Sequence, residues 1–344
     1  MLLFSASRPV LPEWNAFVFS DLFISSLIPD GCETRAVRQR PAMYIGSLGT
    51  DGIQALLFFL MDALIGRPSD SPTVRMGMDV TGPDIILRSN RIPENTVRDR
   101  LGIFKIANIL CDEMRVIVRT AGGNAGYHFR NGKLLDKSVH LSSDDDVLEL
   151  RLIPDRTIFG TGPVDYFTIF DRCRELAALN PGLALRLHGK EQINHIRFDN
   201  GLTDLLLRLS PPSYRIREPL SVYGNKDGVT VKASLIQTCF PDLSDSYVNN
   251  CRTREGGSHV EGFLTGLSTA LNRFFRMQGT MRKFSPSSVK NRFNYLIAVE
   301  LDAPEYAGST KRRLQNREVR KIVSEIVCET VFSHLTVNQD WCVI

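Results

Sequence analysis

SYVNNCRTREGGSHVEGF, residues 246–263, is the stretch of this sequence that decides how the surrounding chain folds. Tyr247 and Val248 form a short β-type run, and the Asn249-Asn250 pair after it is typical of a turn. A basic loop follows, and the Gly256-Gly257 pair then separates it from a longer amphipathic segment. The stretch therefore predicts a strand, a turn, a basic loop and a helix in that order.

The helix that begins after the glycine pair has both a start signal and an apolar face. Ser258 is expected to serve as its N-cap, and Glu261 three residues later completes a capping box. Apolar residues then recur at spacings of three and four, which predicts one buried stripe. The stripe consists of Val260, Phe263, Leu264, Leu267, Leu271 and Phe274.

Read as a string, residues 246–263 closely resemble the Y-V-N-N-x-x-T-x-E-G-G-T-H-x-x-G-F signature of type II topoisomerase ATPase subunits, the gyrase B and topoisomerase IV B family. A surface loop before an amphipathic helix would account for the spacing of the apolar residues but not for this particular order of residue types. Arg35 to Gly49, RAVRQRPAMYIGSLG, resembles the V-R-K-R-P-G-M-Y-I-G segment of the same family, in the same order. Within it, Met43-Tyr44-Ile45 is predicted to be a short buried strand.

The resemblance extends from about Arg35 to Val327 and implies an α+β fold. The expected architecture is a GHKL (Bergerat-type) α/β sandwich followed by a ribosomal S5 domain 2-like transducer domain. The predicted limits are an N-terminal arm at 1–34, the GHKL ATPase-like domain at 35–210 and the transducer at 211–344, with the boundary at Ser210-Pro211-Pro212-Ser213. No TOPRIM domain is predicted, because no E-G-D-S-A-G-G or D-x-D pattern follows.

Gly52 to Ile65 is apolar almost all round, which predicts a buried helix. In the family, this helix carries F-E-x-x-D-N, whose Glu activates water and whose Asn binds the magnesium of ATP. Aligned through Phe58 and Asp62, the general-base position holds Phe59 and the magnesium-ligand position holds Ala63. The resemblance thus leaves Asp62 as a candidate nucleotide contact and predicts no catalytic residue and no metal ligand.

Two further nucleotide motifs of the family are reduced in this chain. The D-x-G-x-G motif, whose Asp binds adenine, corresponds to the end of the strand predicted at 84–87, where Ser89 or Asn90 stands for the Asp. The glycine-rich lid, whose backbone amides wrap the phosphates at a helix N-terminus, corresponds to LGIFKIANIL at 101–110. Only Gly102 and Asn108 of that motif remain there as candidate contacts.

YAGSTKRRL, residues 306–314, resembles the F-x-G-Q-T-K-x-K-L loop, whose Lys reaches the terminal phosphate from the transducer. Thr310 and Lys311 match this motif, and Ser309 replaces its Gln. In isolation such a run is more often the basic start of a helix. In this context Lys311 is the strongest single candidate for a phosphate contact.

Strands are also predicted at 114–120, 126–129, 147–153, 183–187, 220–222, 230–238 and 294–301, with a closing helix of the first domain at 201–209. A helix from Asp165 is expected to turn Phe167, Phe170, Cys173, Leu176 and Leu179 inward. Residues 1–30 are too irregular to assign, and either an arm that packs on a partner or a loosely held terminus fits them.

The 344 residues carry a net charge of only +4, with 43% hydrophobic residues, as in an ordinary globular protein. The location of the charges is therefore more informative than their sum. Lys311 to Lys321 is strongly basic, which fits a solvated helix face or a phosphate-facing one. Eight basic residues of the second half are expected to face DNA: Arg252, Arg254, Arg273, Arg276, Arg282, Lys283, Lys290 and Arg292.

The seven cysteines are scattered without a Cys-x-x-Cys pair, which favours reduced thiols in a cytoplasmic protein. The six histidines are dispersed as well and indicate no metal site. No signal peptide and no membrane-spanning run are predicted. Because the nuclease motifs of the family are missing, this chain alone is not expected to cleave DNA.

Two hypotheses follow. In the first, the chain is a gyrase B-like clamp or regulator with a degraded nucleotide site and no cofactor, acting on DNA or on gyrase or topoisomerase IV subunits, as a homo- or heterodimer. In the second, it is an ATP- and Mg-dependent topoisomerase subunit that changes DNA topology with other chains. The loss of three motifs favours the first, since removal of a general base alone costs about 10² to 10⁴ in rate.

Overall fold

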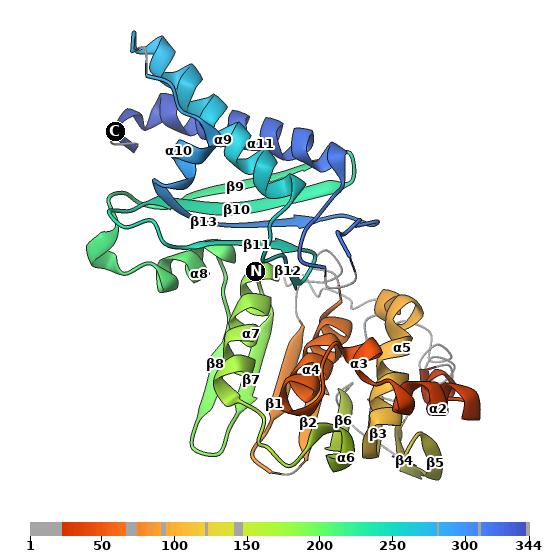
Figure 1. The fold of residues 1–344 in the computed structure, drawn as a ribbon. Coiled ribbons are helices and arrows are strands. Elements are labelled where there is room, and N and C mark those ends of the chain that lie inside the picture. Colours follow the sequence, from red (N-terminus) through yellow and green to blue (C-terminus); the bar gives the residue numbers. More distant parts are fainter. Residues whose placement is uncertain are drawn as a thin grey trace, which may run out of the picture. The chain divides into compact units, whose positions relative to one another are not determined.

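The computed structural model describes residues 23–66, 74–82, 84–90, 94–120, 123–140, 147–280, 282–308 and 311–341. They form two compact units (Figure 1). The first unit holds the described residues up to Gly66, those between 74 and 171, and Ala184–His195. The second holds Arg172–Leu183 and the described residues from Ile196 onward.

The first unit is built on an eight-stranded sheet in the order β5-β4-β3-β6-β2-β1-β7-β8. β1 and β7 run parallel, whereas the pairs from β1 through β2, β6, β3 and β4 to β5 are antiparallel. The strands are β1 Arg75–Asp79, β2 Ile85–Ser89, β3 Cys111–Thr120, β4 Gly123–Arg130, β5 Lys133–His140, β6 Val147–Pro154, β7 Ala184–His188 and β8 Ile193–Ile196. Apart from Met43-Tyr44-Ile45, the strands predicted in this half of the chain are confirmed.

Helices α4 and α5 lie over one face of this sheet (Figure 1). Burial alternates along the strands as a result: Leu87 of β2 is fully buried beneath the helices and its neighbour Arg88 is exposed on the open face. The helices are α2 Gly31–Gln39, α3 Ala42–Ile45, α4 Gly49–Ile65, α5 Glu94–Leu110 and α6 Arg156–Phe159, and α7 Tyr166–Leu179 begins in this unit. The buried helix predicted at 52–65 is thereby confirmed.

Two local predictions in this half are wrong. Met43-Tyr44-Ile45 is not a buried strand but the helical turn α3, in which Met43 is 73% exposed. Pro41 has helical backbone angles and Gly46 has φ 81°, so the flanking residues begin and end a turn rather than a strand. Phe167 does not face inward but is 68% exposed. Ile169 takes the buried face instead, and a residue two positions earlier lies about 200° round the helix.

Residues 1–22 of the predicted N-terminal arm lie outside the described residues. Residues 23–27 are helical, and Phe23 and Leu27 are fully buried in the first unit. Asp30 then caps α2 through a capping box with Glu33. The last third of the predicted arm is therefore integrated into the first unit.

The second unit is built on a five-stranded sheet in the order β12-β11-β13-β10-β9, in which β11 and β13 run parallel. The strands are β9 Leu220–Lys226, β10 Val229–Gln237, β11 Ser244–Val248, β12 Cys251–Arg252 and β13 Phe293–Glu300. The helical elements are α8 Leu202–Leu209, η2 Pro212–Tyr214, α9 Ser258–Met277, α10 Pro286–Lys290, α11 Arg317–Val337 and η3 Gln339–Trp341. Helix α8 packs on β10 and β13, so this unit takes in residues that precede Ser210.

Helices α9 and α11 pack closely on each other over this sheet (Figure 1). A Cβ atom at Gly262 would lie 2.4 Å from the carbonyl oxygen of Arg320, and one at Gly266 would lie 2.5 Å from that of Ser324. Only glycine permits this approach of the two backbones. The predicted stripe is confirmed, since Phe263, Leu267, Leu271 and Phe274 are buried and Val260 and Leu264 pack at its margin.

The predicted cap of α9 is wrong. Gly257 is the N-cap residue, and no side chain caps the helix. Among the described residues the Ser258 hydroxyl is buried without a hydrogen-bond partner, and the Ser258 amide donates to the carbonyl of Leu314 at 3.1 Å. The Glu261 carboxylate binds Arg313 at 2.7 Å instead of closing a capping box. The start of α9 is therefore held by Arg313 and Leu314, which lie far along the chain, instead of by a side-chain cap of its own.

Candidate functional site

Helix α4 presents the three positions that the sequence assigned to catalysis and magnesium. Phe59 is 38% exposed, whereas Asp62 and Ala63 are 8% and 1% exposed. The position predicted for the general base thus carries a partly exposed aromatic ring, and the position predicted for the metal ligand carries a buried methyl group. Neither group can accept a proton or bind a cation.

Ser89 and Asn90, the candidates for the adenine contact, lie at the end of β2. Ser89 is 2% exposed. The Asn90 side-chain oxygen accepts a hydrogen bond from the amide of Arg75 at 2.8 Å, and the Asn90 amide donates to the Arg75 carbonyl at 3.1 Å. The Asn90 side chain therefore ties the ends of β1 and β2 together.

Gly102 and Asn108, the remnants of the lid motif, both lie on α5. Gly102 is exposed within the helix, and no atom approaches within 4 Å of the place where its Cβ would stand. Asn108 is 1% exposed, and its Nδ2 donates to the carbonyl of Leu27 at 3.0 Å and to that of Gly132 at 3.4 Å. Asn108 thus joins the helical segment at 23–27 to the β4–β5 turn.

Arg38 and Asp155 form a contact that the sequence analysis missed. Arg38 pairs with the buried carboxylate of Asp155 and donates to the Ile109 carbonyl at 2.9 Å. Burial alone would raise the pKa of Asp155, but hydrogen bonds from Thr157 and Arg38 outweigh it and lower that pKa. Arg38 belongs to RAVRQRP, the segment that resembles the family. The resemblance could therefore have drawn attention to Arg38 as a residue with a structural contact.

Lys311 of the second unit lies in a narrow loop that begins at Tyr306 and returns at Leu314, where the two residues form an antiparallel bridge. Lys311 is exposed with φ 53°, and its Nζ stands 5.9 Å from the centroid of the Tyr306 ring. Thr310, the neighbouring candidate, lies outside the described residues. The loop presents the Lys311 ammonium group to solvent.

This loop is bound to the glycine pair of the 246–263 stretch. The Leu314 amide donates to the Gly256 carbonyl at 3.1 Å, and the Leu314 carbonyl accepts from Ser258 at 3.1 Å. A second contact joins Arg313 to Glu261 on α9 at 2.7 Å. The stretch 246–263 and the loop 306–314, which were recognised separately in the sequence, are therefore joined by hydrogen bonds and an ion pair.

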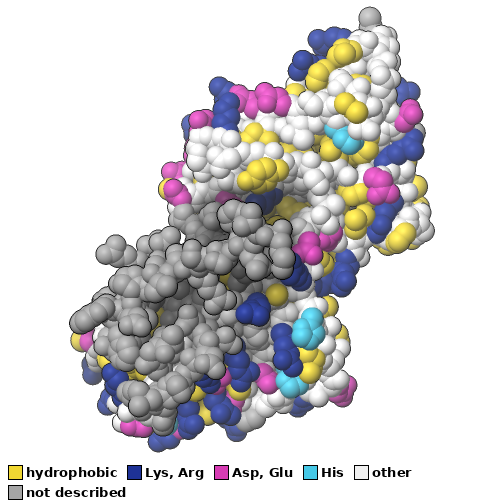
Figure 2. All heavy atoms as spheres, turned by 180° about the vertical axis from the view of Figure 1, so that it is seen from behind, with side chains coloured by type: hydrophobic (Ala, Val, Ile, Leu, Met, Phe, Trp, Pro, Cys, Tyr) yellow, Lys and Arg dark blue, Asp and Glu magenta, His cyan; other side chains and the backbone are white. Residues whose placement is uncertain are grey.

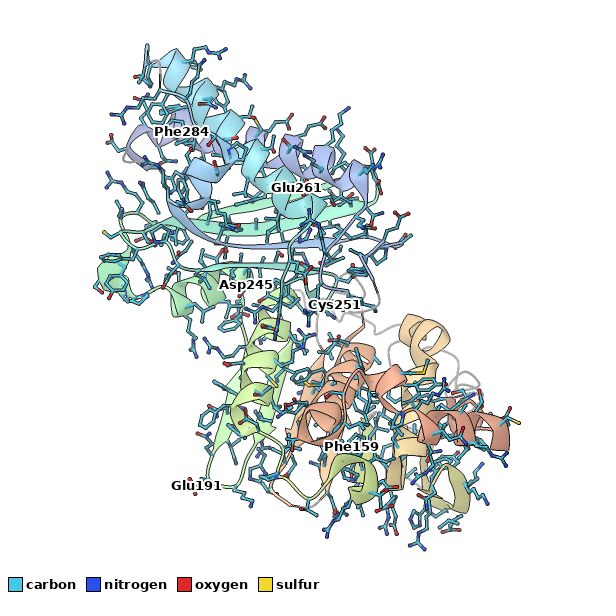
Figure 3. The ribbon with its side chains drawn as sticks, in the orientation of Figure 1. Phe159, Glu191, Asp245, Cys251, Glu261 and Phe284 are labelled. Carbon is cyan, nitrogen blue, oxygen red and sulfur yellow. The ribbon has the colours of Figure 1, made fainter. Side chains whose placement is uncertain are left out.

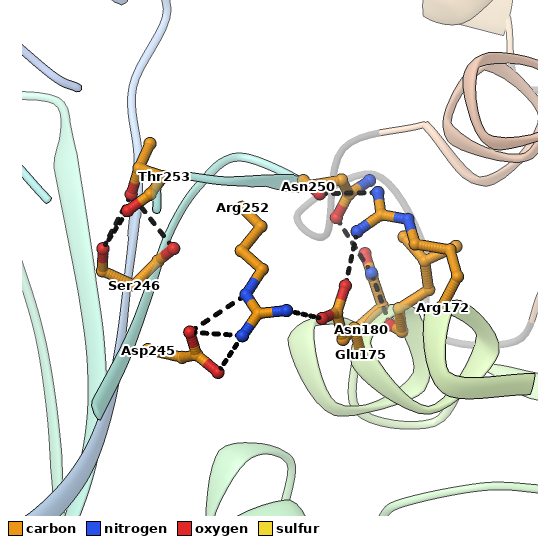
Figure 4. A network of polar contacts seen from close by, with 9 residues as sticks. Arg172, Glu175, Asn180, Asp245, Ser246, Asn250, Arg252 and Thr253 are labelled. Atoms are coloured by element: carbon orange, nitrogen blue, oxygen red, sulfur yellow. Dashed lines mark hydrogen bonds and ion pairs between the residues drawn. The ribbon is translucent and has the colours of Figure 1, made fainter. Parts of the chain in front are cut away.

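Arg252, a candidate DNA contact, is held within the protein (Figure 4). Its Nε and Nη2 donate to the Asp245 carboxylate at 2.6 to 2.9 Å, and Glu175 lies 3.5 Å from its Nη1. This bidentate geometry orients the guanidinium along β11 and β12. Asp245 and Glu175 were not singled out from the sequence.

Asn250 completes the same network (Figure 4). Arg172, which is 8% exposed, donates to the Asn250 carbonyl at 2.7 Å and binds Glu175 at 3.0 Å. The Asn180 amide donates to the Asn250 side-chain oxygen at 3.1 Å. Asn250 therefore has a structural role, since it satisfies the buried polar groups of Arg172 on α7 and of Asn180 just after this helix.

His259 of the same stretch is fully buried at the start of α9. Its Nε2 lies 3.2 Å from the Thr253 hydroxyl, which also bonds Ser246. Burial lowers the pKa of His259 to about 3, so the imidazole is neutral at physiological pH.

The eight candidate DNA contacts fall at opposite ends of α9. Figure 3 shows Glu261 near the N-terminal end of this helix and Phe284 near the other. Since a helix rises about 1.5 Å per residue, the 20 residues of α9 separate Arg254 from Arg276 by about 30 Å.

Six of the eight lie at the C-terminal end of α9 and on the segment that follows, where Figure 2 shows Lys and Arg side chains at the tip of the second unit. They are Arg273, Arg276, Arg282, Lys283, Lys290 and Arg292, hereafter the basic tip, and all six are exposed. Arg273 stacks on the Phe332 ring at 3.8 Å, so part of the basic tip is also packed.

Within the described ranges, no group of three or more His, Cys, Asp and Glu side chains is arranged to hold a metal ion. No helix in that part of the chain combines the length and hydropathy needed to cross a membrane.

The chain is similar to DNA gyrase B proteins. A family model described as DNA gyrase B matches residues 201–342. The chain is 28% identical to the chloroplastic/mitochondrial DNA gyrase B protein of Oryza sativa over 88% of its own length and 49% of that relative. It is also 28% identical to the DNA gyrase B protein of Archaeoglobus fulgidus, over 89% of the chain and 55% of the relative. The chain thus spans about half the length of these relatives.

Solved structures of gyrase B proteins have a similar fold. The 43K ATPase domain of Thermus thermophilus gyrase B, in complex with an aminocoumarin, matches with a TM-score of 0.78 at 21% identity, covering 90% of this chain and 91% of that one. The B-subunit of the DNA gyrase from Myxococcus xanthus matches with a TM-score of 0.78 at 22% identity, covering 89% and 96%. The predicted fold, a GHKL-type sandwich followed by a transducer domain, is confirmed.

Proposed function

We propose that this chain, which resembles DNA gyrase B proteins over 88–89% of its length, is a clamp or regulatory module of the type II DNA topoisomerase family with a non-hydrolysing nucleotide site. It acts on DNA or on a topoisomerase partner, as a homo- or heterodimer. The observation that carries the proposal is the pair of side chains on α4: Phe59 at the general-base position and Ala63 at the magnesium position.

The neighbouring candidates support the same conclusion. The Asn90 oxygen already accepts the Arg75 amide, and the Asn108 amide already bonds two carbonyl groups. Gly102 lies in a continuous helix, whose amides are committed to the helix, rather than in a loop that wraps phosphates. These residues maintain the scaffold of the first unit.

A second function is an ATP-hydrolysing subunit that changes DNA topology together with other chains. It is favoured by the exposed Lys311 and by the retained loop that carries it. It requires that another chain supply the groups that activate water and bind magnesium, because loss of both leaves no useful turnover.

Mg-ATP is expected neither to stabilise the protein nor to be hydrolysed by it. A ligand present at 100 times its Kd stabilises a protein by about 2.7 kcal/mol, so a thermal-shift titration to millimolar Mg-ATP would reveal a functional site. Phosphate release is measured in parallel, with and without a gyrase A protein and DNA. A saturable rise in Tm together with phosphate release that stops in Lys311→Ala would contradict the proposal and establish the second function.

The basic tip is expected to dominate any DNA binding. Replacing Arg276, Arg282 and Lys283 by Gln removes three exposed charges, so log Kd should depend less on log salt, by about 0.9 for each phosphate that the variant no longer neutralises. A fluorescence anisotropy titration of duplex DNA at several salt concentrations measures the slope.

A control variant replaces Arg197, Arg217 and Lys226, three exposed cations elsewhere on the second unit, with Gln. The control should keep the slope of the original protein, and equal changes in both variants would show that only net charge matters. Absence of DNA binding in both, with retention of gyrase or topoisomerase IV subunits on the immobilised protein, would identify the partner-binding form of the proposal.

A further inference from the structure

The open face of the eight-stranded sheet, opposite α4 and α5, carries a pocket that contains no residue of the nucleotide motifs. It is lined by Asp84, Glu113, Arg115, Arg151 and Ile153. These residues belong to β3 and β6 and to the turn before β2, which all lie in the first unit. The pocket is therefore separate from the candidate nucleotide site on the helix-covered side.

Two arginines face each other in this pocket. The antiparallel register of β3 and β6 pairs Arg115 directly with Arg151. Directly opposed like charges destabilise a sheet unless something neutralises them. The side chains are 53% and 44% exposed, so a ligand from solvent can reach both guanidinium groups.

The two carboxylates of the pocket already bind other side chains. Asp84 accepts from the Nε of Arg151 at 2.6 Å and lies 2.5 Å from its Nη2. Glu113 binds Arg130 at 2.5 Å and His128 at 3.1 Å, and lies only within 3.9 Å of Arg115. The hydrogen bond from Arg130, followed by that from His128, lowers the pKa of Glu113, so this carboxylate stays ionised.

Three arginines therefore share two carboxylates, which leaves at least one positive charge in excess at the pocket. Arg115 is paired least closely of the three, since its Nη2 approaches Glu113 only to 3.9 Å, beyond hydrogen-bond distance. Its guanidinium carries five N–H donors and is thus the group of the pocket with the most hydrogen-bonding capacity left for a ligand.

We propose that this pocket binds an oxyanion, a phosphate group, between Arg115 and Arg151. A tetrahedral oxyanion accepts paired N–H donors from guanidinium groups and removes the repulsion between the two arginines. Ile153 supplies an apolar wall on one side of the pocket. The site is independent of the proposed function, since no residue of the nucleotide motifs takes part.

Inorganic phosphate is titrated into the full chain by isothermal titration calorimetry, with KCl adjusted to hold the ionic strength constant. Arg115→Gln is expected to weaken binding by about tenfold or more, because charge-assisted hydrogen bonds to the anion are removed. Glu113→Gln should act in the opposite direction and strengthen binding, because it removes a repelling carboxylate. The opposite signs distinguish a specific site from a general loss of stability.

Arg186→Gln is the matched control, because Arg186 is an exposed arginine of β7 that pairs with Gly77 of β1 rather than with another arginine. Its phosphate affinity should equal that of the original protein. Unchanged binding in Arg115→Gln, equal weakening in Arg186→Gln, or no binding of phosphate at all would each overturn the proposal.

A second titration compares a 5′-phosphorylated oligonucleotide with the same oligonucleotide without the phosphate. Preference for the phosphorylated form, abolished in Arg115→Gln, assigns the site to a nucleic-acid end. Binding of inorganic phosphate without this preference assigns it to a free anion. Failure of either result leaves the Mg-ATP and DNA experiments unaffected, so the two proposals are tested separately.

Discussion

Gly257→Ala is expected to destabilise the second unit by about 3 kcal/mol or more, through backbone strain and overpacking together. Gly257 has φ 131°, a conformation that L side chains rarely adopt. An added Cβ would also lie 2.3 Å from the oxygen and 2.5 Å from the nitrogen of Leu314, which are backbone atoms. The substitution would therefore separate the Lys311 loop from the start of α9. Urea denaturation followed by circular dichroism measures the decrease in stability.

Gly279→Ala is the matched control for this prediction. Gly279 also has a positive φ, 74°, but no atom lies within 4 Å of its Cβ position. The control should cost only the conformational strain of about 1–2 kcal/mol. Equal decreases in stability in the two variants would show that the close approach to Leu314 contributes nothing.

Acidification is expected to destabilise the second unit through His259. The imidazole has a pKa of about 3 in the folded protein, against 6.5 for the ordinary value. The unfolded chain therefore binds one more proton at pH values between these two, so the free energy of unfolding falls as pH falls. The slope is about 1.4 kcal/mol per pH unit, or roughly 2–3 kcal/mol between pH 6.5 and 4.5.

Urea denaturation at pH 7.0, 5.5 and 4.5 measures this effect. His259→Gln should flatten the profile in this window, whereas His195→Gln, which removes an exposed imidazole, should retain it. Because His259 also contacts Thr253, the variant itself is expected to be less stable. Nuclear magnetic resonance of the original protein therefore provides a second measurement: a His259 imidazole that titrates near pH 6 in the folded state would refute the prediction.

The sequence was most informative where a pattern repeats. The stripe from Val260 to Phe274 predicted the buried face of α9, because a period of 3.6 residues places these side chains on one side. The strand predicted at Met43-Tyr44-Ile45 was wrong, because three apolar residues are too few to distinguish the period of a strand from that of a helix. Pro41 and Gly46 decided its conformation.

The candidate site could be predicted only in part. The sequence identified Phe59 and Ala63, because the absence of an acid and an amide is a property of the residues themselves. It did not reveal that Asn90 and Asn108 bond Arg75, Leu27 and Gly132, since those partners lie far away in the chain.

Residue chemistry and periodicity were enough to predict most of the elements, the family resemblance and the chemical groups present at each motif. Which groups meet depends on the folded structure: Leu314 with Gly256 and Ser258, Asn250 with Arg172, and Arg115 with Arg151. The physical reason is that periodicity and residue chemistry are local properties. Strand register and helix packing depend on contacts between distant segments, and a shift of one residue in register would turn Arg115 to the other face of the sheet.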